Sequence, residues 1–266
     1  MPKQKQDVII VGAGPAGIFA ALELSRRSDL RITILDKGHP IDKRRCPARE
    51  GRDCAFCQPC SIMNGWGGAG AFSDGKLTLS PASGGHLGQL LGEQQAQSLI
   101  DEVDSVYVEY GANKNVYGRH TNEYKSLERI LAGLRLVSVP IRHMGTEHSA
   151  EIMGHMYEDL VERGVHVKML TPVAEVLVND GAVVGVETER GEVIEAPRVI
   201  LAPGREGAEW LKRIAAELGL TLTCNPVDLG VRVELPAKVV EPLTHLLYEF
   251  KFLYYSPSFD DLVRTF

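Results

Sequence analysis

The stretch DVIIVGAGPAGIFAALELSRR, residues 7–27, decides the fold of this chain. Val8–Val11 is a run of β-branched residues, typical of a strand buried on both faces of a parallel sheet. Gly12, Gly14 and Gly17 follow in G-x-G-x-x-G spacing, and the apolar residues after them recur at helical intervals. The pattern therefore predicts a strand, a tight turn and a helix whose N-terminus binds the phosphates of a dinucleotide.

A second strand is predicted at Ile32–Leu35, and it ends in Asp36. Asp36 lies nineteen residues after Gly17, where a carboxylate is expected to accept hydrogen bonds from the adenosine ribose hydroxyls. The same carboxylate would repel a 2′-phosphate, which disfavours an NADP-type adenosine at this site. Because strand, glycines, helix and acid occur in the required order, the motif is more specific than three glycines alone.

Further elements are predicted between residues 151 and 218. A helix with one apolar face is expected first, and three short strands separated by the turns NDG and RG lie between two longer stretches of predicted sheet. The predicted elements are a helix at 151–163, strands at 165–169, 176–178, 183–187, 193–195 and 199–201, and a helix at 206–218.

The glycine fingerprint, the three-strand excursion and the VILAPG strand at 199–204 resemble the glutathione-reductase-type FAD/NAD(P)-binding superfamily. A closer resemblance, to bacterial FAD-dependent dehydrogenases or oxidoreductases of undefined substrate, is carried by GGAGAFSDGKL, IRHMGTEHS, DLGVRVE and DDLVRTF. The chain departs from the superfamily at Pro203, where a threonine is usual. The resemblance implies FAD, more than NAD, as the dinucleotide.

The resemblance also implies which residues contact the cofactor. In such folds the segment after the ribose-binding strand runs under the cofactor, and glycines in it permit a close approach of the backbone. The predicted cofactor-binding residues are Gly12, Gly14, Pro15, Ala16, Gly17, Asp36, Lys37, Gly67, Gly68, Ala69, Gly70, Val173, Ala202 and Gly204.

Two basic features near this glycine-rich segment remain open at this point. Lys76 is a candidate for stabilising the anionic reduced flavin ring, and the alternative is a surface lysine in a loop. Arg44 and Arg45 follow the ribose-binding strand. They either meet phosphate or adenine or form a solvated basic patch, and the patch is slightly favoured.

Four of the five cysteines fall within fifteen residues, as Cys46, Cys54, Cys57 and Cys60. Four thiolates can hold an iron–sulfur cluster or a zinc ion, which makes these residues candidate metal ligands. The alternatives are a redox dithiol that passes electrons to flavin and four reduced, partly buried thiols. Cys224 is isolated and is expected in the core.

The histidines offer weaker candidates for catalysis. His143 and His148 lie in a polar stretch between apolar segments, which is compatible with a general acid. The alternative is that both, with His155, are ordinary surface or capping residues.

Composition restricts the class of protein. The chain has 266 residues, a net charge of −6 and no long basic run, which argues against nucleic acid as a partner. No window of eighteen residues is continuously apolar and no signal-peptide pattern is present, so we expect a cytoplasmic protein without a membrane partner. The expected partner is a small-molecule substrate, and homo-oligomerisation is compatible with the sequence.

The sequence thus predicts an α/β fold: a three-layer FAD/NAD(P)-binding Rossmann-like domain with a small antiparallel β excursion over residues 1–219, and the beginning of a second, mainly β domain over 220–266. The expected function is that of an FAD-dependent oxidoreductase that moves a hydride to or from flavin N5, with NAD(P) as a candidate electron donor. The alternatives are an electron-transfer or scaffold flavoprotein that uses the cysteine cluster, and an NAD(P)-dependent reductase without flavin.

The chain is further expected to be incomplete. The resemblance implies a later segment that returns to the first domain with a Gly-Asp pair, and no such pair follows Gly204. Apolar residues of the tail, among them Val231 and Val233, would then be exposed.

Overall fold

The computed structural model describes residues 5–83, 85–118, 134–137, 139–145, 148–224, 229–244, 251–258 and 262–264. The chain forms two compact units, and each is discontinuous in sequence. The first consists of Met1–Ser73 and Thr146–Asn225, and the second of Asp74–Gly145 and Pro226–Phe266.

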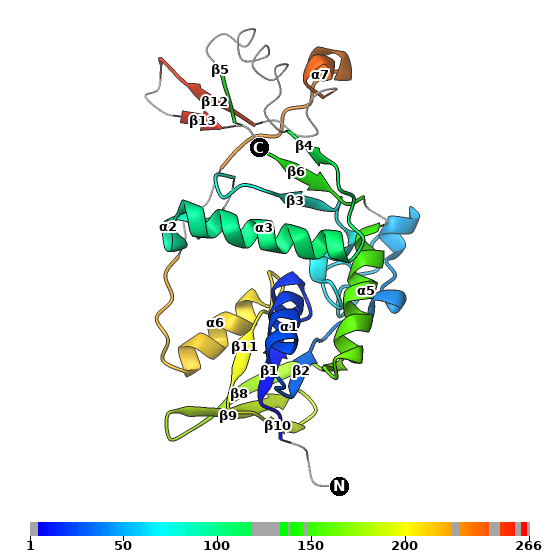
Figure 1. Cartoon of the computed structure of the whole chain (residues 1–266), viewed down its shortest axis with the longest axis vertical. Helices are drawn as coiled ribbons and strands as arrows, with labels where there is room; N and C mark the ends of the chain where they lie inside the picture. The colour runs from blue at the N-terminus through cyan, green and yellow to red at the C-terminus, as the bar shows by residue number, and fades with distance from the viewer. Residues whose placement is uncertain are drawn as a thin grey trace. The chain divides into compact units, whose positions relative to one another are not determined.

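A four-stranded parallel sheet forms the centre of the first unit (Figure 1). All its strand pairs are parallel, with Ile9 beside Val199 on one side and beside Thr33 on the other. Every residue of β1 and β2 is buried, as predicted from their unbroken apolar runs. In sheet order the strands are β11 (Val199–Leu201), β1 (Val8–Val11), β2 (Ile32–Leu35) and β7 (His166–Lys168).

Helices cover one face of this sheet. Helix α1 (Pro15–Arg27) packs against β1 and β2 and buries Ile18, Ala21 and Leu22, which share one helical face. Helix α5 (His148–Glu162) packs against α1 and buries Ile152, Met156 and Leu160 on its own apolar face. The unit also contains α6 (Ala208–Glu217).

An antiparallel sheet packs on the other face and completes the three layers (Figure 1). Its strands, in the order β10-β9-β8, are β8 (Val173–Asn179), β9 (Ala182–Thr188) and β10 (Val193–Glu195). Ile9, Val11 and Leu35 of the parallel sheet form one buried cluster with Val173 and Val186. The predicted three-strand excursion is therefore confirmed, and β8 begins three residues earlier than expected.

The segment from Asp36 to Ser73 carries three short 3₁₀ helices. They are η1 (Ile41–Lys43), η2 (Pro47–Glu50) and η3 (Gly68–Phe72), of which η1 and η3 pack against α5. The remaining backbone of this segment is irregular, so its position depends on the side chains described in the next section.

In the second unit, the described residues form two three-stranded sheets and three helices. One sheet has the order β3-β6-β4 and the other β13-β12-β5. The elements are β3 (Lys76–Thr78), α2 (Leu87–Leu91), α3 (Glu93–Glu109), β4 (Val116–Tyr117), β5 (Leu134–Val137), β6 (Ile141–His143), α7 (Ala237–Thr244), β12 (Lys251–Tyr255) and β13 (Leu262–Arg264). Helix α3 is fixed to β6 by Arg142, whose guanidinium donates to both oxygens of Asp104 at 2.5 and 2.7 Å.

The division between the units differs from the expected boundary near residue 220. Residues 74–145 were expected in the first domain, whereas the structure groups them with the C-terminal segment, where β12 pairs with β5. The stretch NEYKSLERILAGLR, residues 122–135, predicts a helix from its sequence; it lies almost wholly outside the described residues, and Leu134 begins a strand. Val231 and Val233 are exposed, at 88% and 70%, in irregular backbone.

Candidate dinucleotide-binding site

The turn between β1 and α1 requires glycine at two of its three positions. Gly12 has φ +109°, and a Cβ there would lie 2.1 Å from the carbonyl oxygen of Ala202 at the end of β11. A Cβ on Gly17 would lie 1.9 Å from the carbonyl oxygen of Gly12. These two glycines therefore allow β1, β11 and α1 to approach closely, whatever the turn binds.

Gly14 differs from its two neighbours, because the protein itself does not need it. A Cβ on Gly14 would meet only the Cα of Gly68, at 3.9 Å, which is an ordinary contact. Gly14 is the N-cap residue of α1, has an extended backbone and is followed by the exposed residues Pro15 and Ala16. Its lack of a side chain leaves the backbone at the helix N-terminus open to approach.

A second glycine segment, residues 65–70, lies against this turn. The Gly67 N–H donates to the Ala13 carbonyl at 2.8 Å, and a Cβ on Gly68 would lie 3.0 Å from the Gly14 Cα. Gly67 and Gly68 both have φ in the left-handed region, at +81° and +57°. The structure thus brings the predicted residues of η3 together with those of the first turn, and the contact surface is backbone on both sides.

Asp36 ties these two segments together. Its Oδ2 accepts the Ala13 N–H at 2.8 Å, and its Oδ1 accepts those of Gly38 at 2.7 Å and Gly65 at 3.0 Å. A carboxylate oxygen can accept two hydrogen bonds, so Oδ2 can accept a hydroxyl beside the Ala13 N–H. Asp36 was predicted as a ribose ligand, and its role in holding the two glycine segments had no signal in the sequence.

The side chain of Arg44 holds the second glycine segment in position. Its guanidinium donates to the carbonyl oxygens of Trp66, Ile62 and Ser61, at 2.5, 2.7 and 3.0 Å. Only 5% of Arg44 is exposed, which corrects the preferred interpretation of a solvated patch, and Arg45 is exposed as expected. Burial lowers the pKa of Arg44 to about 10, and the neighbouring Asp36 carboxylate opposes that shift.

Trp66 provides the second anchor, which the sequence analysis missed. Its side chain is fully buried, its Nε1–H donates to the Met153 carbonyl at 2.6 Å, and its ring meets Tyr157 edge-on with centroids 5.0 Å apart. Both partners belong to α5, so Trp66 fixes the glycine segment to that helix. An isolated tryptophan among glycines was the available signal, because such a large ring needs a buried partner.

A cavity of about 130 Å³ opens beside Asp36 and contains several predicted residues. Val173 is buried and Lys37 forms an ion pair with Glu206. The cavity is lined by Val11, Gly12, Leu35, Asp36, Lys37, Asn64, Thr171, Pro172, Val173, Glu189, Pro203, Gly207 and Trp210. Ala202 lies behind it and donates its N–H to Val11 at 2.7 Å, while Gly204 lies in the following turn and does not line the cavity.

The candidate catalytic residues fall into different units. Lys76 on β3 pairs in register with His143 on β6 in the second unit, and its ammonium lies 3.3 Å from the Asp74 carboxylate. His148 begins α5 in the first unit, is exposed, and lies 3.1 Å from the Glu151 carboxylate. The structure thus brings Lys76 and His143 together and gives His148 a local partner.

The four clustered cysteines do not form a metal site. Cys54 and Cys57 are exposed, Cys46 and Cys60 are half-buried, and all are free thiols. Within the described ranges, which include every cysteine, no group of three or more His, Cys, Asp or Glu side chains is arranged to hold a metal ion. The predicted iron–sulfur or zinc centre is therefore unsupported. Cys224 is exposed, which corrects its expected place in the core.

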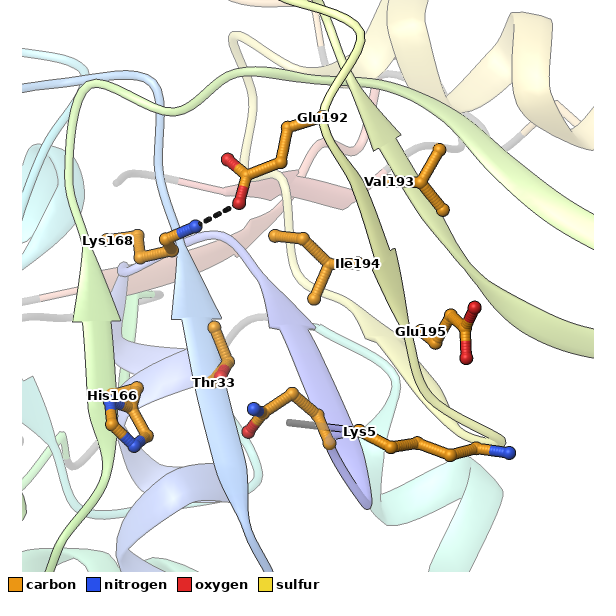
Figure 2. Close-up of a pocket in the computed structure, with 9 residues that line it drawn as sticks. Lys5, Thr33, His166, Lys168, Glu192, Val193, Ile194 and Glu195 are labelled. Carbon is orange, nitrogen blue, oxygen red and sulfur yellow. Dashed lines mark hydrogen bonds and ion pairs between the residues drawn. The ribbon is translucent and has the colours of Figure 1, made fainter. Parts of the chain in front are cut away.

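Another cavity, of about 330 Å³, is a different feature (Figure 2). Thr33, His166 and Lys168 line it from β2 and β7, opposite Glu192 and its neighbours on the antiparallel sheet. Lys168 pairs with Glu192 at 2.6 Å, and both side chains are more than 40% exposed. The cavity contains none of the predicted site residues, and its opposite charges offset one another at the surface.

The first unit has a Rossmann-like arrangement, in which a parallel sheet and a glycine turn lead into the N-terminus of α1. Residues 10–41 match the family described as NAD(P)-binding Rossmann-like domain. An uncharacterized protein of Clostridium beijerinckii is 24% identical over 233 residues, which is 87% of this chain and 37% of that protein. The chain therefore spans little more than a third of the length of this relative.

Solved structures with a similar arrangement were also found. Glycine oxidase from Geobacillus kaustophilus has a TM-score of 0.48 and 18% identity, covering 82% of this chain and 59% of that one. L-amino acid deaminase from Proteus vulgaris has a TM-score of 0.47 and 16% identity, covering 83% and 51%. In the part of the chain that the structure describes, no helix is long and apolar enough to cross a membrane.

Proposed function

We propose that this chain is the dinucleotide-binding part of an FAD-dependent oxidoreductase that acts on a small-molecule substrate. The observation that carries the proposal is the contact between the two glycine segments, where Gly68 lies against Gly14 at the N-terminus of α1. At this surface, glycine backbone lies beside a helix N-terminus. A pyrophosphate can bind there, because a bound dinucleotide has to approach the protein backbone closely.

The residues present fit such a cofactor. The first turn of α1 would hold the pyrophosphate, Asp36 would accept a ribose hydroxyl, and the cavity beside Val173 would hold the adenine. When bound, FAD supplies hydride transfer at flavin N5. The contribution of the protein is to bind and orient: Arg44 and Trp66 hold the glycine segment in place.

The charges around Lys37 argue against a 2′-phosphate on the adenosine. Among the described residues that line the cavity, the cation is Lys37 and the carboxylates are Asp36 and Glu189. Lys37 is paired with Glu206, so its charge is already compensated. The site is therefore proposed to accept FAD or NAD(H) and to reject NADP(H).

An NAD(P)-binding reductase without flavin is the second candidate, and the match of residues 10–41 to an NAD(P)-binding family favours it. Purification and a visible absorption spectrum separate the two, because only bound flavin absorbs in that range. Titration of the apoprotein with FAD, NADH and NADPH completes the test. Tight NADH binding without detectable FAD binding would replace the first proposal by the second.

The ribose contact is best tested by changing the ligand. Replacing Asp36 would leave three backbone N–H groups without their acceptor, so a loss of binding could come from a displaced loop. We expect ADP to bind roughly ten times more tightly than 2′-deoxy-ADP or 3′-deoxy-ADP, since one charge-assisted hydrogen bond is lost. Equal affinities for all three would exclude a ribose contact with Asp36.

A further inference from the structure

A third cavity, of about 230 Å³, lies in the first unit and shares no lining residue with the cavity beside Asp36. Phe72, the last residue of η3, forms part of its wall. The cavity is lined by Arg44, Arg45, Cys46, Arg49, Glu50, Ser61, Ile62 and Phe72. Nothing in the dinucleotide site accounts for three arginines gathered at this place.

Two of these arginines stack on the same ring. The guanidinium carbon of Arg44 lies 4.6 Å from the centroid of Phe72, and that of Arg49 lies 4.7 Å from it. The two charges are therefore within about 9 Å of each other, close enough to repel at physiological ionic strength. Stacking on Phe72 and the neighbouring Asp36 carboxylate offset part of this charge on the Arg44 side, and the cavity keeps an excess of positive charge.

Arg44 is fixed, whereas Arg45 and Arg49 are available. Three of the five N–H groups of Arg44 are used by the carbonyl oxygens of residues 61, 62 and 66. Arg45 and Arg49 are exposed, and among the residues that the structure describes no carboxylate lies within 4.0 Å of either guanidinium. Arg44 thus forms a rigid positive wall, and the other two are placed to close on a ligand.

The charge balance favours an anion. Glu50 is the acid among the described lining residues, and its carboxylate lies 3.9 Å from Arg52, which does not line the cavity. Three guanidinium groups therefore face one partly compensated carboxylate. Planar guanidinium groups bind carboxylate and phosphate oxygens in pairs, and such a ligand would remove the repulsion between Arg44 and Arg49.

We propose that this cavity is a binding site for an oxyanion, a phosphate or carboxylate group, held by Arg45 and Arg49 against the fixed Arg44 and Phe72. The group is either a substrate's own anion or a phosphate of a bound nucleotide. In both cases the cavity contributes binding free energy of its own, separate from that contributed at Gly14 and Asp36. If the anion belongs to a substrate, the candidate substrates include acidic or phosphorylated small molecules.

The test is calorimetric titration of the purified chain with inorganic phosphate, pyrophosphate and citrate. Arg45→Gln and Arg49→Gln are expected to weaken binding of these anions by at least about tenfold each. Arg49→Lys should restore only part of the affinity, because an ammonium cannot bind two oxygens in parallel. Arg190→Gln is the matched control, since it removes the same charge from an exposed arginine of the same unit that does not line the cavity.

Two outcomes would overturn the proposal. One is absence of anion binding by the unmodified chain, and the other is an equal loss in the Arg190→Gln control, which would indicate diffuse surface attraction. Repeating the phosphate titration with saturating ADP and with saturating FAD identifies the source of the anion. Competition by either nucleotide assigns the site to the dinucleotide, and undiminished phosphate binding assigns it to a separate molecule. Failure of the proposed flavin function alone would leave the anion titration unchanged.

Discussion

Replacing Gly14 by alanine should separate ligand binding from folding. The new methyl group would meet only the Gly68 Cα, at 3.9 Å, and the φ of −79° and ψ of 179° are normal for alanine. Alanine is a poorer N-cap than glycine by about 0.5–1 kcal/mol, and the stiffer unfolded chain offsets about 0.4–1 kcal/mol of this. We therefore expect the unfolding midpoint of Gly14→Ala to change by less than about 4 °C.

Binding should respond much more strongly. The methyl group would hold the pyrophosphate away from the backbone N–H groups of α1 and remove at least one charge-assisted hydrogen bond, which contributes about 1.5–3 kcal/mol. The dissociation constant for FAD should then rise roughly tenfold to a hundredfold. Fluorescence titration of FAD with apoprotein, together with calorimetry for ADP, measures this change.

Gly154→Ala is the control for this experiment. Gly154 lies inside α5 of the same unit, and beyond its own helix and chain neighbours no atom lies within 4 Å of the position that its Cβ would take. Gly154→Ala adds the same methyl group and should leave FAD affinity close to that of the parent, while the better helix propensity of alanine raises the unfolding midpoint by up to about 4 °C. A Gly14→Ala protein with a native midpoint and unchanged affinity for FAD and NADH would refute the placement of the pyrophosphate. An unfolded one would refute the reasoning from distances.

Three further predictions concern stability. Gly17→Ala should destabilise the chain by roughly 3 kcal/mol or more, because its Cβ would lie 1.9 Å from the Gly12 carbonyl oxygen; thermal melting followed by circular dichroism checks this. Trp66→Phe should cost about 1–3 kcal/mol in urea unfolding, since the Met153 carbonyl loses its 2.6 Å hydrogen bond, and an unchanged midpoint would contradict the anchoring role. Burial raises the pKa of Tyr107 to about 12, so the contribution of Tyr107 to stability should be constant below pH 10 and fall by about 2 kcal/mol between pH 10 and 12, as this tyrosine ionises in the unfolded chain. The difference in stability between the parent and Tyr107→Phe, measured across this range, should show that slope.

The parallel core could be predicted from sequence because its signals are local. Val8–Val11 and Ile32–Leu35 are unbroken apolar runs, and both have the predicted bounds. The division into units could not be predicted in this way. It depends on the pairing of Leu134 with Tyr254, and two strands so far apart in sequence carry no shared local pattern.

Residues of the candidate site could be predicted from the sequence where the backbone geometry permits only one type of residue. At Gly12 and Gly17, a Cβ would lie closer to a carbonyl oxygen than real Cβ atoms do, so only glycine fits. Their spacing in the sequence therefore predicts this turn reliably. Arg44 carries no such signal, because its burial depends on carbonyl oxygens that irregular backbone happens to present. The spacing of the cysteines predicted a metal site that the structure does not support. Closeness in sequence does not bring side chains to one point when the backbone between them is irregular.

The order of strands in the parallel sheet also delays completion of this sheet while the chain is being synthesised. Ile9 pairs with Val199, so roughly 190 residues must be made before β1 gains its second neighbour. At typical rates of 5–20 residues per second this takes roughly 10–40 s, during which the apolar strands β1 and β2 lack a complete sheet. The nascent chain is therefore expected to depend on chaperones that hold apolar strands, and slower translation of residues 74–145, which belong to the other unit, should lengthen this exposure.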